Sequence, residues 1–205
     1  MPDLRKMSSP VVVDPSPEWS RMGTDLVEEV SRRLGPAATR VAHIGSTAIP
    51  GMAAKPVIDL QVGTELSLDA AEEAFSAPLA ELGFVLSPHR RDHVPAGRDE
   101  EPEPWAKRLW WRRGHTDADA NLHLRREGSP NLRLALLFRD WFRAHPEAVP
   151  GYATFKRVLA RHVVHDTADA DGLAAYTDIK DPVVDVLAEI AEGWAARTGW
   201  QLPEN

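Results

Sequence analysis

The 205-residue sequence contains no cysteine, which excludes disulfide bonds and thiolate metal sites and makes a reducing cytoplasm the natural compartment. It has no apolar run as long as a membrane span, and its first residues lack the hydrophobic segment of a signal peptide. Basic residues are in the minority, with 24 Lys and Arg against 31 Asp and Glu, and a net charge of -7 argues against general nucleic-acid binding. We therefore expect a soluble cytoplasmic protein with no membrane or nucleic-acid partner.

Two catalytic motifs are also missing. There is no Gly-x-x-x-x-Gly-Lys loop, which excludes a P-loop kinase, and Ser46 does not stand in a Gly-x-Ser-x-Gly elbow, which disfavours a serine hydrolase. The composition, at 43% hydrophobic and 27% charged residues, is that of an ordinary globular protein. We expect one domain over residues 11–200, preceded by a loose tail at residues 1–10.

The stretch from His43 to Asp59 holds the strongest local pattern. A β-rich segment runs into Gly45-Ser46, a turn containing Pro50-Gly51 follows, and a second β-branched segment carries Asp59. Gly45 would let the backbone approach a ligand, the amides of Ser46 and Thr47 could point at phosphate oxygens, and Asp59 could hold a divalent cation. The alternative is a tight turn between two core strands with Asp59 as a buried cap.

A longer set of residues extends this pattern. It comprises His43-Ile44-Gly45-Ser46-Thr47, Pro50-Gly51, Lys55-Pro56-Val57-Ile58-Asp59, Leu122-His123-Leu124, Phe138-Arg139-Asp140, Tyr152 with Lys156, and Tyr176 with Lys180. From about Val11 to Trp194 the chain resembles the GrpB family, whose fold is similar to that of the nucleotidyltransferase superfamily. The resemblance implies an α/β fold: a nucleotidyltransferase-like mixed β-sheet core with flanking helices and a helical C-terminal third.

Periodicity places the individual elements. Apolar residues at helical spacing predict a helix ending at Leu34, and Ser67 can cap a helix over residues 68–82. Residues 108–113 and 121–125 read as an antiparallel hairpin, whose second arm would present Asn121, His123 and Arg125 on one face as the floor of a cleft. Residues 87–104 form a long loop, either a functional lid or disordered. Further expected elements are a short strand at 11–13 and helices over 132–144 (capped by Asn131), over 152–162 and from Asp181-Pro182 onward.

The resemblance also indicates which residues carry chemistry. Nucleotidyltransferases follow the Gly-Ser loop with two metal-binding carboxylates, two residues apart on the next strand, and a third acid on a later strand. Here Asp59 is followed by Gln61 at the second position, and His123 stands on the later strand. The catalytic candidates are Asp59, Ser46 and His123, and the candidate ligands for Mg²⁺ are Asp59 and His123. His123 could instead hydrogen-bond the loop or a ligand oxygen. Asn121 replaces a histidine common in the family.

The remaining candidates would bind an anion. Gly45, Ser46, Thr47 and His43 come from the loop, and Lys55, Arg139, Lys156 and Lys180 come from four separate segments. If the fold gathers these basic side chains, they form a local anion pocket in an acidic protein. Each could instead be a solvated charge, and Arg139 could pair with the adjacent Asp140.

Two functions are consistent with these features. The first is binding of a nucleotide or other phosphorylated small molecule, with transfer of a nucleotidyl group assisted by a divalent cation. The second is a catalytically inactive accessory module. The resemblance implies such a role beside a dephospho-CoA kinase, because members of the family are found fused to that enzyme.

Overall fold

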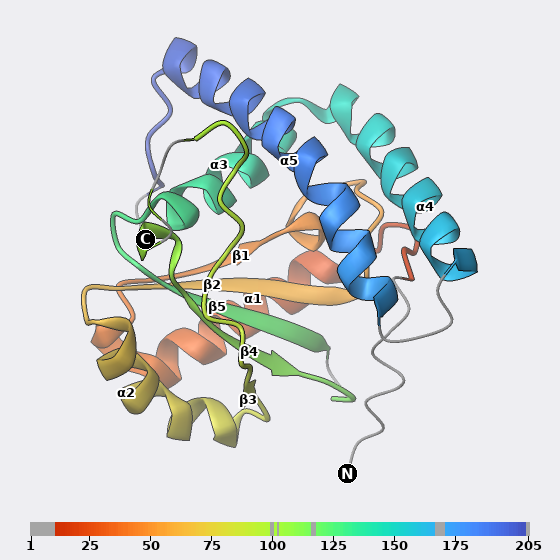
Figure 1. The fold of residues 1–205 in the computed structure, drawn as a ribbon. Coiled ribbons are helices and arrows are strands. Elements are labelled where there is room, and N and C mark those ends of the chain that lie inside the picture. The colour runs from red at the N-terminus through yellow and green to blue at the C-terminus, as the bar shows by residue number, and fades with distance from the viewer. Residues whose placement is uncertain (1–10, 99–100, 102, 116–117, 167–170, 204–205) are drawn as a thin grey trace.

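The computed structural model describes residues 11–98, 101, 103–115, 118–166 and 171–203 (Figure 1). The tail expected at residues 1–10 lies outside the described residues. Among the described residues, no helix combines the length and the apolar character that a membrane span needs.

A five-stranded mixed sheet forms the centre of the molecule, in the order β1-β2-β5-β4-β3. The central strands β2 and β5 are parallel, and the other neighbours are antiparallel. The strands are β1 (Arg40–Ile44), β2 (Val57–Thr64), β3 (Val85–Leu86), β4 (Arg108–Arg112) and β5 (Asp119–Arg126). The predicted class, a mixed α/β sheet with flanking helices and a helical C-terminal third, is confirmed.

Two helices cover one face of the sheet: α1 (Glu18–Leu34) and α2 (Leu68–Glu81) (Figure 1). Their apolar residues join those of β2, β4 and β5 in the main core. Both helices were predicted, and the Ser67 hydroxyl accepts a hydrogen bond from the Ala70 amide at 3.2 Å, as an N-cap should.

The C-terminal helices gather on the other side: α3 (Pro130–Ala144), α4 (Val149–Asp166) and α5 (Asp171–Thr198). They form a second apolar cluster with the turn after β1. The predicted start of the last helix at Asp181-Pro182 is wrong, because α5 begins at Asp171 and contains Pro182. A proline removes one backbone donor, and apolar contacts of Tyr176 before it and of Val183, Val184 and Leu187 after it hold the helix together.

Two smaller expectations are also corrected. Ser129, not Asn131, stands at the N-cap of α3, and Asn131 is buried in the first turn, where its side chain serves another segment. The expected strand at 11–13 is reduced to an isolated bridge between Val13 and Ala54. Short 3₁₀ turns complete the chain at Gly35–Ala37, Ser46–Ala48, Glu103–Trp105 and Pro146–Ala148.

The predicted hairpin of β4 and β5 is confirmed, including its two faces. Leu122 and Leu124 are fully buried in the main core. Asn121, His123 and Arg125 point to the opposite face. Alternation along β5 therefore separates the core from a polar surface that faces α3, α4 and α5.

The long loop between β3 and β4 crosses that polar face. We call residues 89–98 the strap. The strap is attached to the sheet side by a bond from the Asp92 amide to the Trp105 carbonyl at 2.9 Å. It is attached to α5 through Asp185, whose carboxylate lies 3.0 Å from His93 Nε2 and accepts the Ala96 amide at 2.9 Å. The described part of the loop is thus folded across the sheet.

Candidate functional site

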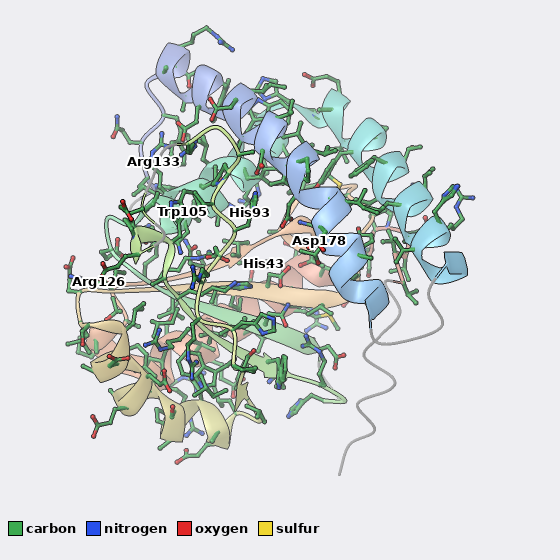
Figure 2. The ribbon with its side chains drawn as sticks, in the orientation of Figure 1. His43, His93, Trp105, Arg126, Arg133 and Asp178 are labelled. Carbon is green, nitrogen blue, oxygen red and sulfur yellow. The ribbon has the colours of Figure 1, made fainter. Side chains whose placement is uncertain are left out.

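A cavity of about 800 Å³ lies between the polar face of the sheet, the strap and the C-terminal helices. We call it the cleft. Its walls include the Gly45-Ser46-Thr47 turn, Asp59, the polar face of β5 and side chains of α4 and α5. In Figure 2, His93 and Trp105 mark where the chain between β3 and β4 passes beside it. The floor predicted from β5 is therefore the floor of a cleft.

The glycine-serine turn stands directly against Asp59. The antiparallel register sets Ile44 opposite Asp59, so that Gly45 leaves the end of β1 beside that carboxylate. Gly45 has φ +69, and a Cβ there would lie 2.5 Å from Asp59 Oδ2. Only glycine satisfies both the backbone angle and the approach. The expected placement of the loop next to Asp59, in a cleft, is what the structure has.

Asp59 is held by an amide from the neighbouring strand. Asn121 lies opposite Asp59 in the parallel register and donates from Nδ2 to Asp59 Oδ1 at 2.7 Å. The side-chain oxygen Oδ1 of Asn121 in turn accepts a hydrogen bond from the Arg113 guanidinium at 2.6 Å. Burial opposes the charge of Asp59, yet the nearby imidazole of His123 and the Asn121 hydrogen bond bring the pKa of Asp59 below its ordinary value. Asp59 is therefore a carboxylate at neutral pH.

Both nitrogens of His123 face protein groups. Lys107 Nζ lies 3.4 Å from Nδ1, and Asp59 Oδ1 lies 3.9 Å from Nε2. An ammonium group can only donate, so Nδ1 accepts and Nε2 carries the proton. Burial, followed by the charge of Lys107, lowers the pKa of His123, so the ring is neutral. In this tautomer the Nε2 proton of His123 faces Asp59, and the ring presents no free lone pair to the cleft.

Gln61 is fixed by two partners. Its carbonyl accepts a hydrogen bond from the Arg125 guanidinium, and its amide donates to the Leu132 carbonyl at 3.1 Å. The resemblance places a second metal-binding acid at this position, and here a neutral amide stands there, hydrogen-bonded to the Arg125 guanidinium.

Asp92 of the strap, which the sequence did not single out, completes this network. Its carboxylate lies 2.8 Å from Arg125 Nε and 2.5 Å from Lys107 Nζ, and it accepts from Asn131 at 3.0 Å. Burial opposes its charge, but the two cations set the pKa of Asp92 well below its usual range. Asp92 and Lys107 belong to no sequence motif, and their partners are up to 39 residues away. No local pattern could therefore have indicated their role in the site.

The predicted magnesium ligands, Asp59 and His123, lie side by side on neighbouring strands and form a sparse ligand set. Among the described residues, no group of three or more His, Cys, Asp or Glu side chains could hold a metal ion. Mg²⁺ prefers six oxygen ligands, and the two predicted ligands supply one carboxylate, that of Asp59, beside the neutral imidazole of His123. One oxygen of that carboxylate already accepts the Asn121 amide.

Lys156 is the most buried cation of the cleft, with 3% of its surface exposed. Its ammonium donates to the Ser46 hydroxyl at 2.8 Å and lies 5.0 Å above the Tyr152 ring. Among the described residues, no carboxylate lies within ion-pair distance of it. Burial, with the charge of Lys180 second, lowers the pKa of Lys156 to about 7.

Lys55 repeats this arrangement across the turn. Its ammonium lies 4.8 Å above the Tyr176 ring, again with no carboxylate within ion-pair distance in the described part of the chain. Burial is the largest cause that lowers the pKa of Lys55 to about 8. Lys180 lines the same cleft but pairs with Asp181 at 3.0 Å. Three of the four expected basic residues therefore meet.

Arg139 and His43 lie elsewhere. Arg139 pairs with Asp140 at 2.7 Å and donates to the His43 carbonyl at 3.1 Å. The His43 ring packs against Gly23 of α1, and its Nε2 lies 2.9 Å from the Thr47 hydroxyl. Burial lowers the pKa of His43 to about 4. Both line a separate, smaller cavity, so His43 supports the turn from behind and Arg139 ties α3 to β1.

The family model described as GrpB protein matches residues 9–189. The chain belongs to the GrpB family. This GrpB protein is 32% identical over 156 residues to UPF0157 protein BH1888 of Halalkalibacterium halodurans, a match that covers 76% of this chain and 71% of the relative. The crystal structure of GrpB from Enterococcus faecalis has the same fold, with a TM-score of 0.67 at 22% identity, over 90% of this chain and 99% of the other.

Longer relatives carry a different name. A protein of Mycobacterium tuberculosis named dephospho-CoA kinase is 36% identical over 205 residues, which covers 93% of this chain and 48% of the relative. The GrpB chain thus spans about half the length of these curated relatives.

Proposed function

We propose that the cleft binds a nucleotide or another phosphorylated small molecule, with the phosphate between Lys156, Lys55 and the Gly45-Ser46-Thr47 turn. The observation that carries the proposal is the Lys156 ammonium, which is buried against the Ser46 hydroxyl with no carboxylate within ion-pair distance among the described residues.

A buried cation without a partner is unfavourable, and a protein normally pairs it or removes its proton. The lowered pKa values of Lys156 and Lys55 express this strain in the free protein. A phosphate dianion between the two ammonium groups would relieve it and would form charge-assisted hydrogen bonds with both. The net charge of -7 repels anions from the protein in general, so an anion would be held only where cations such as Lys156 and Lys55 gather.

Nucleotidyl transfer is the finer form of this proposal. Asp59 lies against the turn, where its carboxylate could share a cation with phosphate oxygens. Because Gln61 stands where a second metal-binding acid would be needed beside Asp59, we expect Mg²⁺ to enter with the phosphate ligand, which supplies the missing oxygens.

A binding module without chemistry is the second candidate. It is favoured by Gln61, which stands where a second acid would be needed and is held by Arg125. In the longer relatives named dephospho-CoA kinase, such a module would act beside the remaining half of the chain, and a CoA precursor would be a fitting ligand.

Thermal-shift measurements with nucleotides, pyrophosphate and CoA precursors, with and without Mg²⁺, test the proposal, because a ligand that binds the folded state raises its stability. Lys156→Met should abolish the shift. Lys180→Met is the matched control, since Lys180 lines the same cleft but already has a carboxylate partner, and it should retain most of the shift. No shift with any phosphate compound, or equal losses in the two variants, would contradict the proposal.

A further inference from the structure

Trp111 is a second feature of the cleft that the phosphate site does not use. It follows Trp110 on β4, and alternation places the two indoles on opposite faces of the sheet. Trp110 is buried in the main core with 1% of its surface exposed. Trp111 lines the cleft and is half-buried.

The indole of Trp111 makes no ring or cation contact among the described residues. No other aromatic ring stacks on it, and no cation lies over it, in the part of the chain that the structure describes. Val85, which lies opposite Trp111 on β3, is 60% exposed, so the sheet is open to solvent on that side. A large aromatic surface that faces a cavity without a ring partner is suited to stacking with a flat ligand.

The sheet register fixes where this surface lies relative to the phosphate site. Trp111 is opposite Asn121, and Asn121 is opposite Asp59, which touches the Gly45 turn. Two strand spacings separate Trp111 from Asp59, a distance of about 10 Å. An extended nucleotide can span such a distance between its base and its phosphates, and the cavity of about 800 Å³ is within the range of small-molecule sites.

We propose that the phosphorylated ligand of the cleft is a nucleotide, whose aromatic base stacks on Trp111 while its phosphates meet Lys156 and Lys55. This inference rests on the proposed function and narrows its ligand class. A phosphorylated sugar or an inorganic phosphate would fill the cationic end of the cleft and leave the indole uncovered.

Calorimetric titration with AMP and with ribose 5-phosphate, which differ by the base, tests the inference. Stacking of one base on an aromatic side chain should make AMP bind about 5- to 150-fold more tightly than ribose 5-phosphate. Trp111→Leu should remove this difference and leave the affinity for ribose 5-phosphate unchanged. Trp111→Phe, which keeps a flat ring, should preserve most of the difference.

The possible outcomes separate the two proposals. If AMP and ribose 5-phosphate bind the wild type equally well, or if Trp111→Leu keeps the preference for AMP, the stacking site is refuted while the phosphate site stands. If neither compound binds and Lys156→Met changes nothing, the phosphate site itself fails and the stacking inference fails with it. Unchanged binding of ribose 5-phosphate also shows that Trp111→Leu is folded.

Discussion

Lys156 should make both the stability of the protein and its affinity for anions depend on pH. Burial brings the pKa of this lysine from 10.5 to about 7, which corresponds to on the order of 5 kcal/mol of unfavourable interaction with its charged form. Between pH 7 and pH 10.5 the unfolded chain binds a proton at Lys156 that the folded protein does not. Stability therefore rises with pH in this window, by about 1.4 kcal/mol per pH unit from this group alone.

An anion bound in the cleft should raise the pKa of Lys156 again, because it stabilises the charged form. Sulfate is a suitable probe, because its own charge does not change over this range. When sulfate restores the pKa of Lys156 towards its ordinary value, binding at pH 8 takes up about 0.9 of a proton at this group, and affinity falls about tenfold for each further pH unit. Lys55, with a pKa of about 8, adds a second proton above that pH.

Two measurements check this reasoning. Urea unfolding from pH 7 to pH 9.5 should show wild-type stability rising with pH. Lys156→Met should lose most of the slope below pH 8, keep the part due to Lys55 above pH 8, and be more stable than wild type near pH 7. Calorimetry of sulfate binding in buffers of different ionisation enthalpy should reveal proton uptake by the wild type and no sulfate binding by the variant. A variant that is less stable than wild type with an unchanged slope would refute an uncompensated buried charge at Lys156.

Three further predictions concern the groups around the turn. Gly35→Ala and Gly45→Ala impose similar backbone strain, at φ +63 and φ +69. An added Cβ would meet open space at Gly35, but it would clash with Asp59 at Gly45. In urea unfolding the first should therefore cost about 1–2 kcal/mol and the second about 1–3 kcal/mol more, and equal losses would contradict the close approach. Asp92→Asn should destabilise the fold by about 3–5 kcal/mol in the same assay, because it leaves two buried cations unbalanced, and a loss under 1 kcal/mol would contradict this. Magnesium, titrated by calorimetry, should bind the nucleotide complex and not the free protein, and equal binding to both would contradict a ligand-borne cation.

The sequence predicted those parts of the site that are encoded locally. The turn between two β-rich segments placed Gly45-Ser46 beside Asp59, and period-two alternation in β5 placed Asn121 and His123 on one face. Both patterns lie within single strands or between neighbouring ones, where register follows directly from residue spacing.

The rest depends on distant segments. Asp92 binds Arg125 across 33 residues, and Asp185 holds the strap across 89 or more, so their roles follow only from the packed chain. Arg139 shows the converse: it fits the family pattern as well as Lys156 does, but its position on α3 directs it to the far side of β1. Sequence spacing indicates which face of its own helix a residue occupies, and packing decides what that face meets.

The parallel pairing of β2 with β5 also bears on how the protein folds. The bond that joins Asn121 to Asp59 closes a separation of 62 residues, whereas β1 and β2 are joined by the much shorter segment 45–56. Contacts of long sequence separation are entropically expensive to form and slow folding. During ribosomal synthesis, β2 cannot pair with β5 until Arg126 has been made, and the cleft cannot form until α5 has followed. Refolding followed at the cleft should thus report the slow zipping of the central strands rather than the early hairpin.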